Sequence, residues 1–259
     1  MLNLIELEKY NKCLQKLRLE EMEYLFVAND MSKFGLIENN NKNASMDMMF
    51  EELIKINTSL TIVFPTASLN LVNNETVFDI TRTPSHKMGA FSEHLRKKSE
   101  CHRSLHPFWS VSAIGPKAKE LTSSFSKNPY DKNSVFDKLF NNTHSYFMAL
   151  GKHPRFMLSV IHYIEYISNV KYRFLKNFKK KIIDLNRNEY EDTYQLFVLK
   201  EEYRNLERSK NKLIFINYES KGNLKYYKIN ESELYIFNLR EFFEITLDLF
   251  KKKPDCYWF

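Results

Sequence analysis

The sequence predicts an α/β protein in which a mixed β-sheet is layered with helices and a second, smaller α/β lobe packs against it. Two observations predict this class. Short, fully apolar segments alternate with helical patterns over the first two thirds of the chain, and beyond about residue 170 no histidine occurs. The 259 residues are enough for a sizeable core. We therefore expect one lobe over residues 1–170 and a C-terminal lobe over residues 171–259.

The first quarter of the chain is predicted to form helix, strand, helix and strand. Apolar residues recur with a helical period over 3–20, and the short apolar run over 24–28 is typical of a buried strand. A second helix over 46–56 would be capped by Ser45, and a second buried strand follows over 60–64. Strand, helix and strand in this order indicate a layered arrangement.

The rest of the chain continues this alternation. We expect a helix at 89–98, a strand at 108–112, and helices directly after Pro116 and at 135–140. A strand at 146–150 and a helix at 156–167 follow. For the C-terminal lobe, we expect strands at 195–199, 213–218 and 225–229 around a charged helix at 200–211, then a helix pair or one long helix at 231–252.

The net charge of +7 and a pI near 9.0 favour anionic partners: nucleic acid, an acidic membrane surface or phosphate-bearing small molecules. The lysine-rich run over 176–181 is most simply a solvated face, since neither a nucleic-acid-binding module nor a glycine-rich phosphate loop accompanies it. Three distant cysteines suit a reducing compartment without disulfides. With no signal-peptide pattern and no apolar run of about 18 residues, we expect a cytoplasmic protein without an integral membrane segment.

The candidate functional residues are concentrated in one stretch, because all seven histidines lie between residues 86 and 162. Three of the five glycines, Gly89, Gly115 and Gly151, lie in the same stretch. A chain this poor in glycine places it where the backbone needs a positive φ or approaches another group closely. Histidine suits proton transfer near neutral pH. This stretch is therefore where we expect the site.

His162 and Glu165 form the first candidate pair. Their spacing of three residues places both side chains on one face of a helix. A carboxylate beside an imidazole fixes its tautomer and stabilises the imidazolium that forms when it takes up a proton. A solvated polar face or one arm of a di-metal site has the same spacing, so these alternatives stay open on spacing alone.

The phrase RSLHP, from Arg103 to Pro107, is the second candidate. Arginine suits phosphate or carboxylate, and the Ser104 hydroxyl can donate to a developing oxyanion. The alternative is a polar loop before a strand. His102 and His106 have the i, i+4 spacing of zinc ligands, but Pro107 interrupts a helix there and no third ligand has suitable spacing. We therefore expect no metal site.

Several phrases together resemble the aminoglycoside 3-N-acetyltransferase family, which includes relatives that acylate nucleotide-linked amino sugars. These are VANDMSKFG (Val27–Gly35), VFPT (Val63–Thr66), TPS (Thr83–Ser85), KMG (Lys87–Gly89), RSLHP (Arg103–Pro107), ALG (Ala149–Gly151), and Ser159, His162 and Glu165, similar to the family's T-x-x-H-x-x-E. They follow the family's order over about residues 24–175. The resemblance implies that the α/β fold is that of this family.

The resemblance also implies an N-acyltransferase that acylates a primary amine, with acetyl-CoA or a related acyl-CoA as co-substrate. His162, held by Glu165, would act as general base, and Ser104 would stabilise the tetrahedral oxyanion. The acyl-CoA would be bound by Ser32, Lys33, Phe34, Gly35, Met88, Gly89 and Arg103, and the acceptor by Asp30 and His106. A homodimer is compatible with such an enzyme.

The sequence departs from the family pattern on the acceptor side, since the family's early histidine is Ala28 here. Aminoglycosides are polycations, whereas this chain is basic and better matched to an anionic acceptor. We therefore expect a nucleotide-linked amino sugar, with antibiotic modification as the alternative. A hypothesis of another class is a non-catalytic basic protein that binds nucleic acid or membrane through its lysine runs.

Overall fold

The computed structural model describes residues 3–38, 41–124, 126–206 and 211–256. A seven-stranded mixed sheet forms its centre, in the order β11-β12-β8-β2-β4-β7-β6. The strands of this sheet are β2 (Tyr24–Asn29), β4 (Thr61–Pro65), β6 (His102–Arg103), β7 (Val111–Ile114), β8 (Ser145–Leu150), β11 (Lys225–Ile229) and β12 (Ser232–Asn238). The three central strands, β8, β2 and β4, run parallel, and antiparallel strands extend the sheet on both sides.

The central strands are the ones whose apolar runs predicted buried strands, and all six residues of β2 are buried. Phe26 of β2 lies opposite Val63 of β4 and Phe147 of β8. The rings of Phe26 and Phe147 stack with their centroids 5.6 Å apart. Because successive side chains point to opposite faces of a strand, a strand that is apolar throughout needs cover on both faces.

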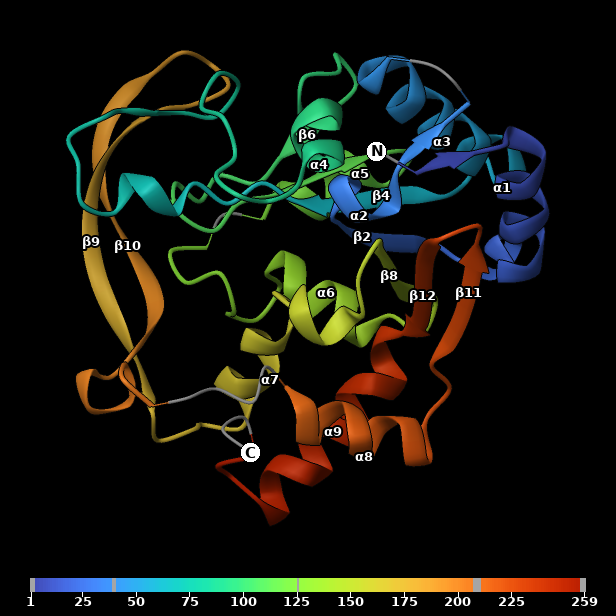
Figure 1. The fold of residues 1–259 in the computed structure, drawn as a ribbon. Helices are drawn as coiled ribbons and strands as arrows, with labels where there is room; N and C mark the ends of the chain where they lie inside the picture. Colours follow the sequence, from blue (N-terminus) through green and yellow to red (C-terminus); the bar gives the residue numbers. More distant parts are fainter. Residues whose placement is uncertain (1–2, 39–40, 125, 207–210, 257–259) are drawn as a thin grey trace.

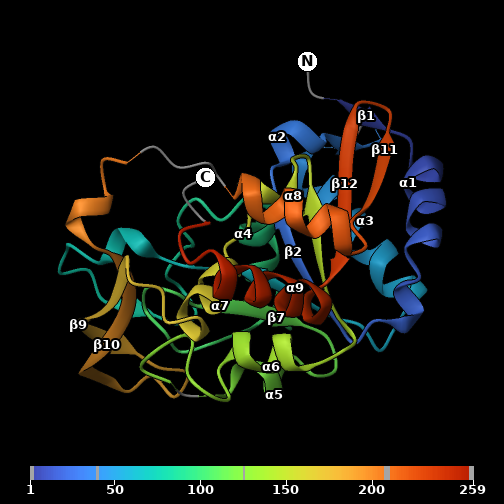
Figure 2. The ribbon, with the colours of Figure 1, turned by 90° about the horizontal axis from the view of Figure 1, so that it is seen from below.

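Two groups of helices supply this cover on opposite sides of the sheet (Figures 1 and 2). On one face, Leu25 and Val27 pack with residues of α1 (Leu7–Leu14), α2 (Met31–Phe34), α3 (Lys42–Ile56) and α4 (Ala90–Arg96). On the other face, Phe26 packs with residues of α5 (Ala118–Thr122), α6 (Val135–Asn141), α7 (Ile161–Ile167), α8 (Lys212–Lys221) and α9 (Leu239–Lys252). The fold class predicted from the sequence is therefore confirmed.

A long hairpin that the sequence analysis missed stands beside this body, at the left of Figure 1. Its strands, β9 (Arg173–Ile183) and β10 (Glu189–Leu199), pair with the short β5 (Phe78–Asp79) in a three-stranded sheet. The run over 176–181 lies on β9, and one of its lysines is not solvated as expected. Lys180 is 5% exposed, and its ammonium donates to the backbone carbonyls of Leu71 and Asn74.

The C-terminal segment also differs from expectation. The predicted strand over 213–218 is the helix α8, because Ile214, Phe215 and Tyr218 share one helical face that packs against α9. The predicted charged helix is a single 3₁₀ turn, η5 (Glu201–Tyr203), within the described residues, and 207–210 lie outside them. Residues 232–238 form β12, and its pairing with β8 continues the main sheet across the expected boundary at residue 170.

Smaller differences arise from local capping. The helix α3 begins earlier than expected because the Asn41 side chain accepts from the N–H of Ala44 at 2.9 Å. Ser45 instead accepts from the N–H of Ile37. The predicted helix over 3–20 contains α1 and two 3₁₀ turns, η1 (Gln15–Leu17) and η2 (Leu19–Glu21), separated by Arg18 with φ of 58°.

Further short elements complete the described structure. They are β1 (Leu4–Ile5), which pairs in parallel with β3 (Leu36–Ile37), and the 3₁₀ turns η3 (Leu69–Leu71) and η4 (Pro154–Phe156). The helix predicted over 156–167 begins only at Ile161, as α7. The predicted strand over 108–112 begins later, at Val111, since residues 108–110 belong to a loop.

Candidate active site

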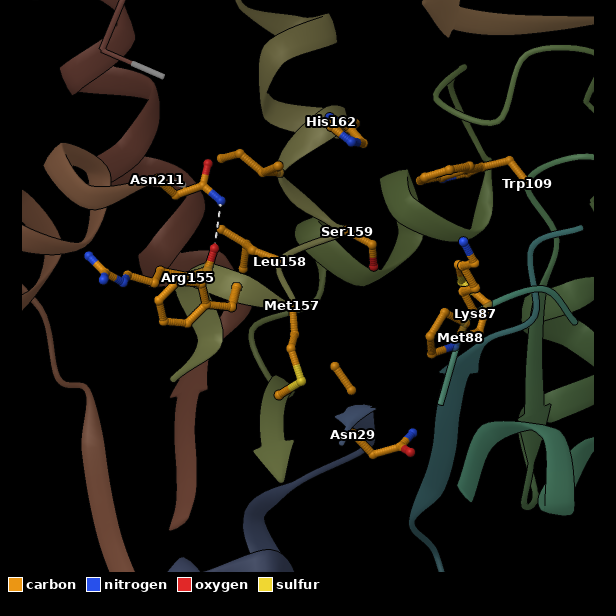
Figure 3. Close-up of a pocket in the computed structure, with 14 residues that line it drawn as sticks. Asn29, Lys87, Met88, Trp109, Arg155, Met157, Leu158, Ser159, His162 and Asn211 are labelled. Carbon is orange, nitrogen blue, oxygen red and sulfur yellow. Dashed lines mark hydrogen bonds between the residues drawn. The ribbon is translucent and has the colours of Figure 1, made fainter. Parts of the chain in front are cut away.

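A pocket of about 590 Å³ opens at the carboxyl ends of the parallel strands β2 and β4 (Figure 3). In open α/β sheets, ligands bind in the crevice beyond the carboxyl ends of the strands. The residues that line the pocket are Ala28, Asn29, Pro65, Lys87, Met88, Trp109, Arg155, Phe156, Met157, Leu158, Ser159, Ile161, His162 and Asn211. They come from the ends of β2 and β4, the loop before α4, the loop before β7, the segment leading into α7, the first turn of α7, and the N-cap of α8.

His162 and Glu165 lie together on α7. Nδ1 of His162 is 2.5 Å from Oε2 of Glu165. The His162 side chain is 20% exposed and lines the pocket, whereas Glu165 is fully buried behind it. The predicted placement on one helical face is thus confirmed. When Nδ1–H donates to the carboxylate, the lone pair of the neutral imidazole lies on Nε2, which suits a proton acceptor.

Two residues that follow α7 complete the surroundings of Glu165. The Tyr172 hydroxyl donates to Oε1 at 3.0 Å. Nε of Arg173 lies 3.0 Å from Oε2, the oxygen that also contacts His162. Burial alone would raise the pKa of Glu165, but His162, Arg173 and Tyr172 together hold that pKa below its usual value. Glu165 is therefore a carboxylate at neutral pH.

Two pocket residues beside His162 carry no role in the sequence analysis. The Trp109 ring lies 5.7 Å from the imidazole, centroid to centroid, and the two rings flank the upper part of the pocket in Figure 3. The Ser159 hydroxyl is buried and makes no hydrogen bond to the described residues. A buried hydroxyl without a partner is costly, and Ser159 is also one of the residues that line the pocket. Its place three residues before His162 was the available signal.

The pocket also contains two cations, Lys87 and Arg155, which lie on opposite sides of it in Figure 3. Lys87 has a positive φ of 59° in the loop before α4. Arg155 is in η4, and its carbonyl accepts from the Asn211 side chain at 2.9 Å, as drawn in Figure 3. Among the described residues that line the pocket, none is aspartate or glutamate.

Of the seven residues predicted to bind acyl-CoA, Met88 lines the pocket. Gly89 lies next to it, with φ of 95°, and a Cβ at this position would collide with the Asn29 side chain. Asn29 in turn accepts from the N–H of Phe91 at 3.2 Å and donates to Ser92 at 2.9 Å. Gly89 therefore allows the start of α4 to approach the end of β2.

The segment Ser32–Gly35, which was predicted to bind acyl-CoA, does not line this pocket. Ser32 and Lys33 are exposed, and Phe34 is fully buried, with its ring 6.4 Å from that of Tyr10. Gly35 has φ of 104°, and a Cβ there would collide with the carbonyl of Asn3. These residues form the turn that connects β2 to β3.

Asp30, predicted on the acceptor side, has a structural role in the same turn. Its carboxylate caps α2 by accepting from the N–H of Ser32 at 3.1 Å, and it pairs with Lys152. The bonds from Lys152 and Ser32 outweigh the effect of burial and lower the pKa of Asp30. This carboxylate does not line the pocket.

Arg103, which was predicted to bind the acyl-CoA, is enclosed by the surrounding loops and does not line the His162 pocket. The side chain is 7% exposed. Its guanidinium donates to backbone carbonyls and hydroxyls of the surrounding loops, with acceptors on Thr66, Ser68, Ile80, Thr83 and Ser110. Burial, helped by the nearby Arg96, lowers its pKa to about 9. Arg103 thus joins loops whose carbonyls would otherwise be unpaired.

Ser104 and His106 also lie away from the His162 pocket. Ser104 accepts from the N–H of Val111 at 3.0 Å, which fixes the turn between β6 and β7. His106 is 4% exposed. Its Nδ1 accepts from the N–H of Trp109 at 3.0 Å, and its Nε2 donates to the carbonyl of Gln195 at 3.1 Å. His106 therefore connects the Trp109 loop to β10 and does not line the His162 pocket; its contact with substrate stays a prediction.

In the described ranges, no group of three or more His, Cys, Asp or Glu side chains is placed to bind a metal ion. Within the same residues, no helix is long and apolar enough to span a membrane.

Comparison with known proteins identifies the family. The family model described as aminoglycoside 3-N-acetyltransferase matches residues 27–251, most of the chain. The chain belongs to this family. As a member of the aminoglycoside 3-N-acetyltransferase family it is an enzyme, an N-acetyltransferase. The search among curated protein sequences gave no match.

Solved structures show the same fold. The YokD protein from Bacillus subtilis is 20% identical, with 96% of this chain and 94% of that chain covered and a TM-score of 0.75. AAC-IIIb, solved as a binary complex with CoASH, is 17% identical, with 97% and 98% covered and a TM-score of 0.78. AAC-VIa bound to sisomicin is 14% identical, with 97% and 99% covered and a TM-score of 0.79. At these identities the likeness concerns the fold of the acetyltransferase family.

Proposed function

We propose that this acetyltransferase transfers the acyl group of acetyl-CoA to a primary amine of an amino sugar, with His162 as the general base. One observation carries the proposal: the His162 imidazole lines the pocket while its Nδ1 is bonded to a fully buried carboxylate, Glu165. This arrangement suits a base because it fixes the tautomer and stabilises the imidazolium. General-base assistance of this kind contributes roughly 10²–10⁴-fold to a rate.

The reaction balances with His162 as the only proton carrier. The imidazole takes a proton from the attacking amine while the nitrogen forms a bond to the thioester carbonyl carbon. The carbon–sulfur bond then breaks, and the departing CoA thiolate receives the proton that His162 holds. The products are an amide and free CoA, so neither a covalent acyl-enzyme nor a metal enters the scheme.

Ser159 is the residue we propose for stabilising the oxyanion of the tetrahedral intermediate, in place of Ser104. The Ser159 hydroxyl lines the pocket, is buried, and makes no hydrogen bond to the described residues. Ser104 lies outside the pocket and bonds to the backbone of Val111. A donor preorganised at an oxyanion contributes about 10²–10³ in rate.

The pocket lining supports acetyl-CoA as co-substrate. Met88, Met157 and Leu158 offer an apolar wall for a flexible thioester arm, and Lys87 and Arg155 offer cations for phosphates. AAC-IIIb, which shares the fold, was solved with CoASH.

For the acceptor, we propose an amino sugar that carries an anionic group, such as a nucleotide-linked amino sugar. The described lining of the pocket has Lys87 and Arg155 but no carboxylate, and the chain carries a net charge of +7. A polycation would meet repulsion in such a pocket. The family's name and the sisomicin complex of AAC-VIa favour an aminoglycoside as the second candidate.

A thiol-release assay with acetyl-CoA tests both parts of the proposal. We expect thiol release only when an amine acceptor is present, and faster release with nucleotide-linked amino sugars than with sisomicin. His162→Asn should abolish it. The matched control is His94→Asn, because His94 also pairs with a carboxylate, Asp47 at 2.8 Å, and is 17% exposed, but lies outside the pocket. If no acceptor of either class supports thiol release, the proposed function is wrong. If only aminoglycosides do, the proposed acceptor alone is wrong.

A further inference from the structure

Arg173 and His162 contact the same carboxylate oxygen. Oε2 of Glu165 lies 2.5 Å from Nδ1 of His162 and 3.0 Å from Nε of Arg173. Arg173 is the first residue of β9, so its contact with Glu165 joins the start of the long hairpin to α7. Its side chain is 8% exposed. A guanidinium buried at this point is a permanent charge next to the proposed base.

We propose that Arg173 is a positioning residue that holds Glu165 ionised and draws part of its negative charge away from His162, so that the imidazole stays unprotonated at neutral pH. This inference rests on the proposed function, in which neutral His162 is the proton acceptor. It assigns the β9–β10 hairpin a part in the chemistry that the sequence analysis did not foresee.

Contacts with β10 hold the Arg173 side chain in place. Its NH1 group donates to the carbonyl of Phe197 on β10 at 3.3 Å, and the guanidinium lies 5.9 Å from the Phe197 ring centroid. The side chain is therefore held by the neighbouring strand while its Nε lies 3.0 Å from Oε2 of Glu165. Because the pair is removed from water, its electrostatic interaction with His162 is screened much less than that of a surface cation.

Other titratable groups lie near the pair in the described part of the chain. Tyr172 donates to Oε1 of Glu165, and Tyr130 and Cys256 lie close enough for the carboxylate to raise the pKa of each further, beyond the effect of burial. All three are neutral near pH 7. On the pocket side, the charged groups among the described lining residues are Lys87 and Arg155. Arg173 is a cation within ion-pair distance of the Glu165 carboxylate, at 3.0 Å.

The direction of its effect follows from charge alone. A positive charge near an imidazole disfavours the imidazolium, so Arg173 lowers the proton affinity of His162. Without Arg173, less of the negative charge of Glu165 would be offset at this oxygen, and the carboxylate would favour the imidazolium more strongly. His162 would then take up its proton at a higher pH. For two charges separated by one carboxylate oxygen, we expect a change of about one pH unit.

The experiment titrates the histidines by NMR in wild-type protein and in Arg173→Gln. The His162 signal is assigned by its absence in His162→Asn. We expect the His162 midpoint in Arg173→Gln to lie about one pH unit above that of wild type, and Arg173→Lys, which keeps the charge, to return toward wild type. The matched control is Lys171→Gln, which removes the same charge from an exposed side chain two residues away and should leave the midpoint unchanged.

The acidic limb of the kcat/KM profile should move to higher pH in Arg173→Gln by the same amount. The NMR titration needs no substrate, so it tests Arg173 even if the proposed reaction fails in the thiol-release assay. Circular dichroism establishes that the variant is folded; if Arg173→Gln is not, Arg173→Met carries the same expectation. If Arg173→Gln or Arg173→Met is folded and its His162 has the same titration midpoint as in wild type, the inference is overturned. A merely structural arginine would leave that midpoint in place.

Discussion

Glu165 lies three residues after His162 on α7 and is fully buried, yet its Oε2 is 2.5 Å from the Nδ1 of that partly exposed imidazole. A carboxylate hidden from the pocket cannot meet the substrate, so its effect on the reaction passes through His162. It keeps Nδ1 protonated, and therefore leaves Nε2 as the acceptor atom.

Glu165→Gln should therefore lower kcat strongly while leaving KM for acetyl-CoA close to that of wild type. The amide keeps the size of the side chain but loses the charge that stabilises the imidazolium, and we expect a loss of roughly 10²–10⁴ in kcat. Steady-state thiol-release kinetics measure it. The control is Glu219→Gln, because Glu219 also contacts a histidine, His153 at 3.0 Å, but lies outside the pocket; similar losses in both variants would contradict the assignment.

Ser159→Ala and Ser104→Ala should separate catalysis from stability. Removing the Ser159 hydroxyl takes away a donor without breaking a hydrogen bond to the described chain, so kcat should fall about 10²–10³-fold with little change in unfolding free energy. Removing the Ser104 hydroxyl leaves the buried N–H of Val111 unpaired, which costs about 1–3 kcal/mol of stability.

For both variants, thiol-release kinetics measure kcat and urea denaturation measures the free energy of unfolding. The opposite pattern, with a large loss of kcat only in Ser104→Ala, would restore the oxyanion role expected from the sequence.

The buried histidine His106 predicts a loss of stability in acid. Burial lowers its pKa from 6.5 to about 4, so below pH 6.5 the unfolded chain binds a proton that the folded protein does not. Stability from this group is thus complete above pH 6.5 and is lost as the pH falls toward 4, by about 3 kcal/mol at most.

Urea denaturation at pH 7 and at pH 4.5 measures this difference. His106→Gln should be less stable than wild type at pH 7, because bonds to Trp109 and Gln195 are altered, but it should lose less stability on acidification. An equal loss in both proteins would mean that other groups cause the acid sensitivity.

The sequence predicted those parts of the fold that depend on local pattern. The strands β2, β4 and β8 were found because each is a short run of apolar residues that is buried on both faces. The strand β9 was missed because its lysines suggested a solvated face, whereas Lys180 is buried and bonds to distant carbonyls. The helix α8 was mistaken for a strand because a short apolar run has no distinctive period.

The candidate site likewise combines residues that local spacing predicts with residues that only the folded chain brings together. The spacing of His162 and Glu165 on one helix was sufficient to place them side by side. Arg173 was not found, because its contact with Glu165 depends on the reversal of the chain after α7. Arg103 resembled a phosphate ligand in sequence, but the loops that carry Thr66 and Thr83 close around it. Contacts between distant segments decided which polar residues face the pocket.

Lys87 and Arg155 provide the prediction that distinguishes the two acceptor classes. If both cations serve only the phosphates of CoA, Lys87→Gln and Arg155→Gln should raise KM for acetyl-CoA and leave KM for every acceptor unchanged. If one of them faces an anionic acceptor, as we propose, its substitution should raise KM for a nucleotide-linked amino sugar roughly 10- to 100-fold, because a charge-assisted hydrogen bond contributes about 1.5–3 kcal/mol. The same substitution should lower KM for sisomicin, since it removes repulsion of a polycation. Neither change should alter kcat much, because the proposed base is His162, whereas Lys87 and Arg155 lie on opposite sides of the pocket. Steady-state kinetics with each substrate varied in turn separate these cases, and Lys171→Gln controls for the loss of one surface charge. If both variants bind sisomicin and the nucleotide-linked sugar as wild type does, charge does not select the acceptor.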